Sequence, residues 1–317
     1  MVPTELTTVT PASVLGPGVA LLATPQTGAK TDGELLDIWL RSHVDGSVHT
    51  LRAYQRVGER FLAALHGSGA DLRSATVEHV QTALQDLRTK TDGSPSRPAT
   101  VNAYVAIAKA LLGFAHRVGF TRFNAAPLIK LKKAPRQIAQ RILAEVDIAM
   151  LIRAARPGRD RLLLEVAYFG GLRVSELVGL TWAQVIPREN REAQLEIVGK
   201  GGKARQVLIP SRLAARLLAS RNDAPATAPV FASVRRPGFP LTDRAINFIV
   251  KGAAELAGIN PAASVHWLRH AHASHAIDNG APITLVSATL GHADLKTTSV
   301  YAHARPGESS GRYLKVK

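Results

Sequence analysis

The C-terminal half of the chain contains polar side chains whose types suit the binding of an anion. They lie in five short stretches: Gly170-Gly171-Leu172-Arg173-Val174-Ser175-Glu176-Leu177, Gly199-Lys200-Gly201-Gly202-Lys203, His266-Trp267-Leu268-Arg269-His270, Leu290-Gly291-His292, and Tyr301. Arg173 and Arg269 can each offer a fork of donors that stays charged at physiological pH, which suits the clamping of a phosphate. His266 and Arg269 are three residues apart on a predicted helix, so both side chains lie on one face.

Each stretch has a plainer interpretation when it is taken alone. Arg173 could pair with Glu176 at the surface, and an isolated Tyr301 is most simply a half-buried helical tyrosine. A metal site is a further alternative, because His266 and His270 have the i, i+4 spacing of two zinc ligands. The glutamate of the corresponding zinc motif is missing, since position 267 is tryptophan, and no third ligand set follows. The sequence therefore predicts no metal site, and no cofactor is expected.

Considered together, the five stretches resemble the catalytic domain of the tyrosine site-specific recombinases, the phage integrase family, and most closely its Xer-like branch. The motifs occur in the family's order, and Tyr301 follows His292 by nine residues. This resemblance covers residues 142 to 304. A looser resemblance to the family's core-binding domain covers about 33 to 125, through Thr50-Leu51-Arg52-Ala53-Tyr54 and Thr100-Val101-Asn102-Ala103-Tyr104. Two departures are Asn124-Ala125-Ala126-Pro127, where the family often has Asn-Pro, and a long N-terminal tail.

The resemblance implies that six residues form an active site that cuts and rejoins DNA: Arg173, Lys200, His266, Arg269, His292 and Tyr301. The two arginines would clamp the scissile phosphate while Tyr301 attacks it and becomes joined to the 3′ end. His266 would take the tyrosine proton, Lys200 would protonate the departing 5′ oxygen, and His292 would hydrogen-bond a phosphoryl oxygen. Because two arginines balance the phosphate charge and the ester retains the bond energy, neither Mg²⁺ nor ATP is expected.

Composition indicates a folded protein with a polyanionic partner. The 317 residues are 46% apolar and include 40 lysines and arginines against 24 acidic residues, a formal charge of +16. This excess indicates nucleic acid or an anionic membrane surface. We identify no apolar segment of about 20 residues and no basic amphipathic helix with aromatics, so no membrane association is expected. Cysteine is absent, which is compatible with the cytoplasmic location that we expect.

The hydrophobic pattern predicts a mainly α protein with a small β-sheet, and the resemblance implies that it consists of a helical (SAM-like) core-binding domain and a tyrosine-recombinase catalytic domain. Residues 1–32 are assigned to a flexible tail outside both cores. The core-binding domain is expected at 33–125 with four helices, a basic linker at 126–141 and the catalytic domain at 142–317. Helices are predicted from 34 to about 44, from 47 or 50 to 66, and at 76–87, 99–118, 144–156, 159–169, 174–180 and beyond 212. Alternating apolar residues on both sides of 200–203 predict a β-hairpin.

Further basic side chains are candidates for contacts with the DNA backbone: Arg52, Arg56, Lys130, Lys132, Lys133 and Lys203. The three lysines of the linker belong to a basic run with no acidic residue before Glu145, and each phosphate that they neutralise would release counterions. A solvated helix face for the two arginines and a merely soluble linker are the alternatives that the sequence leaves open.

Double-stranded DNA target sites are the expected partner, and the resemblance implies a tetramer on two duplexes, with a second recombinase or an accessory protein as a further partner. Two rival functions are a catalytically silent DNA-binding regulator and a type IB-like topoisomerase, which would use similar groups without exchanging strands. The sequence leaves the target site open. It also leaves open whether the task is chromosome-dimer resolution, integration of a mobile element or plasmid resolution.

Overall fold

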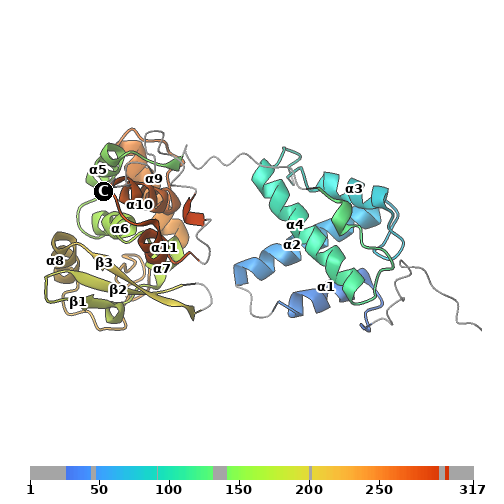
Figure 1. Ribbon diagram of the computed structural model, residues 1–317, viewed down its shortest axis with the longest axis horizontal. Helices are drawn as coiled ribbons and strands as arrows, with labels where there is room; N and C mark the ends of the chain where they lie inside the picture. The colour runs from blue at the N-terminus through green and yellow to red at the C-terminus, as the bar shows by residue number, and fades with distance from the viewer. Residues whose placement is uncertain are drawn as a thin grey trace, which may run out of the picture. The chain divides into compact units, whose positions relative to one another are not determined.

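The computed structural model describes residues 26–43, 48–90, 92–130, 141–199, 202–292 and 297–299. The chain divides into two compact units, residues 1–135 and 136–317 (Figure 1). Each unit has its own hydrophobic core. The first unit is helical and the second combines helices with a three-stranded sheet, which confirms the predicted fold class.

The first unit contains the helices α1 (Asp32–Arg41), α2 (Val48–Gly67), α3 (Val77–Asp86) and α4 (Pro98–Arg117), followed by the 3-10 helix η1 (Ala126–Leu128). Thr31 caps α1 by accepting a hydrogen bond from the Glu34 backbone N–H at 3.2 Å. The apolar faces of the helices meet in one core, in which Trp39, Phe61 and Leu111 are fully buried. The four predicted helices are confirmed, although α1 begins at Asp32 rather than at residue 34.

Helix α4 corrects one expectation from the sequence. By length and composition alone it is apolar enough to cross a membrane, so the expectation that no such segment exists is wrong. Its apolar face lies in the core of the first unit, where it contributes Val105, Ala108, Leu111, Leu112 and Ala115. The helix contacts α1, α2 and η1, and packing within the unit accounts for its composition.

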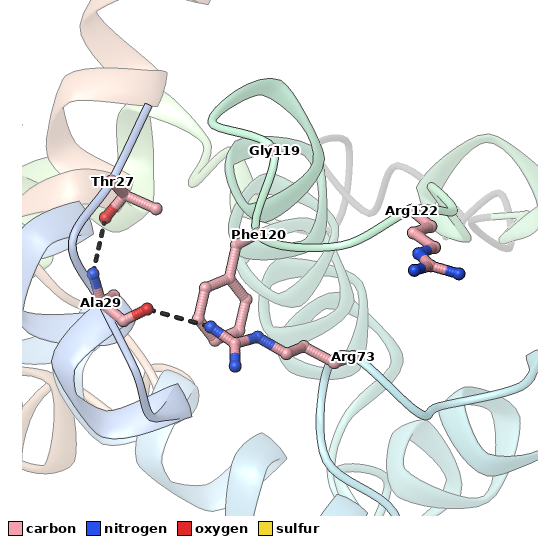
Figure 2. A pocket seen from close by; sticks show the side chains of 6 residues that line it. All are labelled: Thr27, Ala29, Arg73, Gly119, Phe120 and Arg122. Atoms are coloured by element: carbon pink, nitrogen blue, oxygen red, sulfur yellow. Dashed lines mark hydrogen bonds between the residues drawn. The ribbon is translucent and has the colours of Figure 1, made fainter. Parts of the chain in front are cut away.

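Residues 26–32 also differ from the prediction, which placed all of 1–32 outside both cores. Ala29 is buried in the core of the first unit. Arg73 donates from Nη2 to the Ala29 carbonyl oxygen at 3.0 Å, and its guanidinium carbon lies 4.2 Å from the centroid of the Phe120 ring (Figure 2). These partners lie far along the chain, so local periodicity could not reveal that this segment is folded.

The beginning of the predicted linker 126–141 is folded as well. Ala126 is buried, and Lys109 on α4 donates from Nζ to the Ile129 carbonyl oxygen at 2.7 Å. The first unit therefore continues through η1 rather than ending at residue 125. Residues 131–140 lie outside the described residues.

The sheet of the second unit is antiparallel, with strand order β1 (Val185–Pro187), β2 (Ala193–Val198) and β3 (Ala204–Ile209). In its register Val185 pairs with Leu195, and Leu195 pairs with Val207; all three side chains are buried in the core. The β2–β3 pair confirms the predicted hairpin. The sequence pattern does not reveal β1, because three residues are too few to show an alternation.

In the part of the second unit that the structure describes, the helices are α5 (Glu145–Ala154), α6 (Arg159–Phe169), α7 (Val174–Gly179), α8 (Ser211–Ala219), α9 (Asp243–Leu256), α10 (Val265–Asp278) and α11 (Ile283–Leu290), with the 3-10 helix η3 (Trp182–Gln184). Helix α10 contacts α6 and α11, α6 contacts α7, and α11 contacts β3 (Figure 1). This packing gathers the start of α7, the strand β3, the helix α10 and the end of α11.

Candidate active site

Arg173 lies directly before α7, after the double glycine that ends α6. Gly171 has a left-handed backbone with φ of 59°, and a Cβ there would come within 2.8 Å of the side chains of His272 and Leu290. The turn thus brings the end of α6 against α10 and α11. Arg173 donates to Glu176 twice, from its backbone N–H to Oε2 at 2.8 Å and from Nη1 to Oε1 at 2.9 Å. The pairing is therefore real, but the carboxylate is buried rather than at the surface.

Glu176 forms the centre of an arginine cluster. Arg205 on β3 binds both carboxylate oxygens at 2.8 Å, and Nη1 of Arg269 lies 4.0 Å from Oε2. Burial raises the pKa of Glu176, but the hydrogen bond and charge of Arg205 and the bonds from Arg173 outweigh burial and lower this pKa to about 2. The carboxylate is ionised at physiological pH, and three positive charges face one negative charge. The cluster therefore retains positive charge for an anionic substrate.

Arg269 on α10 is held by the backbone of two other motifs. Its side chain is only 3% exposed. Nη1 donates to the Gly171 carbonyl oxygen at 2.6 Å, and Nη2 donates to the Leu290 carbonyl oxygen at 2.5 Å. Two bonds from one planar group fix its orientation. This geometry joins the double-glycine turn, α10 and the end of α11 into one site.

His266 lies in the first turn of α10, and its ring remains partly exposed. Partial burial lowers the pKa of His266, and the positive charges of Arg269, Arg141 and Arg173 lower it further. The neutral ring therefore predominates at pH 7, which is the form that a general base requires.

Two histidines of α10, His266 and His270, lie beside positively charged arginines. The His266 and His270 rings lie edge to face, with centroids 4.1 Å apart. Burial, then the charges of His266, Arg141 and Arg269, lower the pKa of His270 to about 4. Among the described residues, no group of three His, Asp or Glu side chains is placed to hold a metal ion.

His292 follows Gly291, which ends α11 with a left-handed backbone. Nδ1 of His292 lies 2.7 Å from Oγ1 of Thr298, a buried residue three positions before Tyr301. Burial, then the charge of Arg269, lowers the pKa of His292 to about 4. A neutral ring with one nitrogen fixed by a hydrogen bond is suited to donate or accept at the other nitrogen.

The structure brings together four of the six predicted catalytic residues: Arg173, His266, Arg269 and His292. The charges of Arg173 and Arg269 act on both histidines, which places the four groups in one electrostatic site. The other two residues, Lys200 and Tyr301, lie outside the described residues. The catalytic role of each residue remains a prediction.

Two basic residues of this site, Arg141 and Arg205, lie outside the five sequence stretches that predict it. The positive charge of Arg141 helps to lower the pKa of His266 and of His270, although the sequence pattern places Arg141 in the linker. Arg205 binds Glu176 from β3. The sequence does contain a signal for Arg205. It lies two residues before the apolar Val207, so the two side chains point to the same, buried face of the strand.

The described candidates for contacts with the DNA backbone are exposed: Arg52 and Arg56 on α2, Lys130 after η1, and Lys203 before β3. Arg56 donates to the Tyr104 hydroxyl at 3.4 Å, which links α2 to α4. Lys130 lines a groove together with Arg88 on the first unit. Lys132 and Lys133 lie outside the described residues.

The buried histidines predict that the protein loses stability in mild acid. Burial is the main cause that lowers the pKa of His270, His272 and His292, in each case to about 4. Between about pH 4 and pH 6.5 the unfolded chain therefore binds more protons at these sites than the folded chain, so their stabilising contribution is present above pH 6.5 and is lost toward pH 4. We expect the thermal midpoint of the full chain to fall over this range, and to fall less in His272→Gln. A midpoint that stays constant from pH 6.5 to 4.5 would contradict these pKa directions.

Comparison with known proteins gives a consistent set of likenesses. The sequence model of the phage integrase family matches residues 136–308. Tyrosine recombinase XerC of Xanthomonas campestris pv. campestris (strain B100) is 30% identical over 261 residues, covering 81% of this chain and 79% of the relative. XerC of Pseudomonas aeruginosa is 32% identical over 278 residues, covering 83% and 87%. XerD of Corynebacterium glutamicum is 30% identical over 273 residues, covering 81% and 88%.

Solved structures are similar in fold. The XerH site-specific recombinase bound to its difH substrate, a pre-cleavage complex, has a TM-score of 0.65 at 20% identity, covering 89% of this chain and 83% of that chain. A lambda integrase (75–356) dimer bound to a COC′ core site has a TM-score of 0.66 at 17% identity, covering 90% and 98%. The catalytic fold of the described residues is that of these recombinases.

Proposed function

Because the chain belongs to the phage integrase family, the tyrosine recombinases that cleave and rejoin DNA, we propose that it exchanges strands between two specific DNA sites through a phosphotyrosyl intermediate. In this reaction Tyr301 forms a 3′-phosphotyrosyl ester, and the first strand exchange yields a Holliday junction. Neither a metal ion nor ATP takes part. The observation that carries the proposal is the pair Arg173 and Arg269, held around one buried carboxylate beside two neutral histidines.

The arginine cluster suits the first requirement of the reaction, which is to bind and neutralise a phosphodiester. Arg269 is fixed by two carbonyl oxygens, and the Arg173 side chain is 39% exposed, so it can meet a substrate. Donors that are already oriented stabilise the charge on the phosphoryl oxygens without reorganising during the reaction. We propose that these two guanidinium groups hold the two non-bridging oxygens of the scissile phosphate.

We assign the proton transfers from the neutral state of the histidines and from the roles predicted for Lys200 and Tyr301, which lie outside the described residues. The Tyr301 oxygen attacks phosphorus and its proton passes to neutral His266, while the 5′ oxygen leaves with a proton from Lys200. The lowered pKa of His266 supports its role as the base. For rejoining, the 5′ hydroxyl of the partner strand gives its proton to Lys200 as it attacks the ester, and Tyr301 leaves with the proton that His266 holds. His292 donates to a phosphoryl oxygen.

We propose that both units bind the same duplex, with the core-binding unit and the catalytic unit joined through the basic segment after Lys130. Four copies would act on two duplexes in the cytoplasm, alone or with a second recombinase or an accessory protein. The XerH and lambda integrase structures are complexes with a difH substrate and a COC′ core site, which supports the choice of duplex DNA as the partner. Two distinct folded units are compatible with a clamp around DNA.

The linker lysines give a prediction about the salt dependence of DNA binding. If Lys130, Lys132 and Lys133 bind phosphates, their replacement by alanine should flatten the plot of log affinity against log salt by about one unit for each phosphate that is no longer neutralised. Fluorescence anisotropy with a labelled duplex over a salt series measures this slope. Lys251→Ala, an exposed change on α9, is the control and is expected to keep the wild-type slope. An unchanged slope in the triple variant would remove these lysines from the DNA interface.

The function is tested by covalent capture followed by strand exchange, with EDTA present and ATP omitted. Sheared genomic DNA is incubated with the protein, and fragments that remain bound after denaturation are sequenced to give the site. Two differently labelled duplexes that carry this site are then mixed with the protein. We expect hybrid duplexes with both labels. DNA binding without a covalent adduct would favour a silent regulator, and relaxation of supercoils without hybrid products would favour a topoisomerase.

A further inference from the structure

Arg205 is the residue of this cluster to which neither the family motifs nor the proposed reaction gives a task. Its side chain is 10% exposed and lies at the start of β3. Each of its three guanidinium nitrogens makes a hydrogen bond within the site: Nη1 and Nη2 bind the two oxygens of Glu176 at 2.8 Å, and Nε donates to the Thr289 carbonyl oxygen at 2.7 Å. The guanidinium thus joins β3 to α7 and to the last turn of α11.

Gly291 leaves room for this side chain, and Gly199 lies beside it at an ordinary contact distance. A Cβ at Gly291 would lie 3.0 Å from Cδ and 3.3 Å from Nε of Arg205, so a side chain there would force the arginine to shift. A Cβ at Gly199, at the base of the hairpin, would lie 3.7 Å from Nη1. Arg205 therefore packs directly under the residue that precedes His292.

We propose that Arg205 is a positioning residue that holds the Glu176 carboxylate and thereby leaves Arg173 available for the scissile phosphate. The inference rests on the proposed function, because it concerns the arginine that would bind the substrate. Arg205 contacts no reacting atom in this account and acts through Glu176 and the end of α11.

If Arg205 were absent, one of the two remaining arginines would have to respond. The buried Glu176 would then lack the guanidinium that binds both of its oxygens, and an uncompensated buried carboxylate is costly. Arg269 cannot approach further, because two backbone carbonyls hold it at 3% exposure. Arg173 is 39% exposed, and its Nη1 is already 2.9 Å from Oε1. The Arg173 guanidinium would therefore turn onto Glu176 and away from the phosphate.

This mechanism differs from a purely structural ion pair in one measurable respect. If Arg205 only stabilises the fold, the folded fraction of Arg205→Ala should form the adduct at the wild-type rate, and adding Glu176→Gln should raise the thermal midpoint without changing that rate. If Arg205 prevents Glu176 from capturing Arg173, the folded Arg205→Ala protein should be slow and Glu176→Gln should restore its rate in part, because glutamine has the same shape and no charge to attract the guanidinium. The double variant therefore separates the two roles.

The test measures the single-turnover rate of adduct formation with a suicide substrate that carries the captured site, together with DNA affinity, for the full chain. Arg205→Ala is expected to slow adduct formation about 100-fold, the effect of a misplaced substrate-binding group, with DNA affinity changed by less than about threefold. The double variant, Arg205→Ala with Glu176→Gln, is expected to form the adduct at least about tenfold faster than Arg205→Ala alone.

Arg216 and Glu165 form a matched control pair between α8 and α6, with Nη1–Oε1 at 2.9 Å and Nη2–Oε2 at 2.8 Å. Arg216→Ala, alone or with Glu165→Gln, is expected to leave the rate unchanged. If Arg205→Ala does not fold, Arg205→Gln, which fills more of the space without the charge, replaces it in the same comparison with the same criterion.

The outcomes distinguish this inference from the proposed function. Absence of an adduct with the wild-type protein would contradict the proposed function itself. A wild-type adduct, combined with equal rates for the single and double Arg205 variants, would overturn the positioning role of Arg205 alone. Recovery in the double variant supports it.

Discussion

A Tyr301→Phe variant is expected to bind its DNA site with wild-type affinity and to form no covalent adduct with it. Phenylalanine keeps the ring and removes the oxygen that would attack phosphorus, so the substitution should leave the arginine cluster and the histidines intact. Cleavage of a suicide substrate, followed by denaturing electrophoresis, measures the adduct. The expected change is from an easily detected band to none, the largest effect that we predict for any single substitution.

Tyr313→Phe provides the control for this experiment. It makes the same chemical change at the neighbouring tyrosine, which lies in the final Arg312-Tyr313-Leu314-Lys315 segment. The resemblance to the tyrosine recombinases implies that this segment docks on a neighbouring subunit, so we expect the variant still to form an adduct at a single site. An adduct that persists in Tyr301→Phe and disappears in Tyr313→Phe would assign the nucleophile to the other tyrosine.

Arg269→Lys is expected to lower the rate of adduct formation by about 100- to 1,000-fold, although the positive charge is kept. The arginine donates to the Gly171 and Leu290 carbonyl oxygens from two different nitrogens. A lysine ammonium is a single point charge and cannot span both carbonyls while also facing a phosphate. The loss should appear in the single-turnover rate more than in DNA affinity, because the basic surface that binds the DNA backbone is unchanged.

Arg159→Lys is the matched control for Arg269→Lys. Arg159 also bonds a backbone carbonyl, that of Ala232 at 2.8 Å, and it pairs with Asp160, but it is not part of the proposed site. Its replacement should leave the rate of adduct formation unchanged. Near-normal cleavage by a folded Arg269→Lys variant would show that the forked geometry is not required and would count against the clamp.

Much of the second unit follows from short-range sequence signals. The double glycine predicts a turn at Gly171, and the alternation of Val207 and Ile209 predicts a strand that returns against its neighbour. The order of the motifs then indicates which residues share a site. The structure brings Arg173, His266, Arg269 and His292 together, although they come from three separate parts of the chain.

Other features could not be predicted because they depend on contacts between distant residues. Glu176 has a plain local interpretation as a surface partner of Arg173, and only the approach of Arg205 from β3 makes it a buried centre of charge. Likewise, the sequence around Ala29 gives no local signal of burial, yet Ala29 lies in the core and its carbonyl oxygen accepts a hydrogen bond from the distant Arg73. Sequence periodicity reports on one element at a time, whereas these sites arise where elements meet.

The central claim is that Tyr301 becomes covalently joined to DNA. The most direct test digests the trapped adduct with protease and nuclease and identifies the modified peptide by mass spectrometry. We expect one peptide that contains Tyr301, with a 3′-linked nucleotide on the phenolic oxygen, formed in EDTA. A nucleotide attached to any other residue, or to the 5′ end of the cut strand, would contradict it.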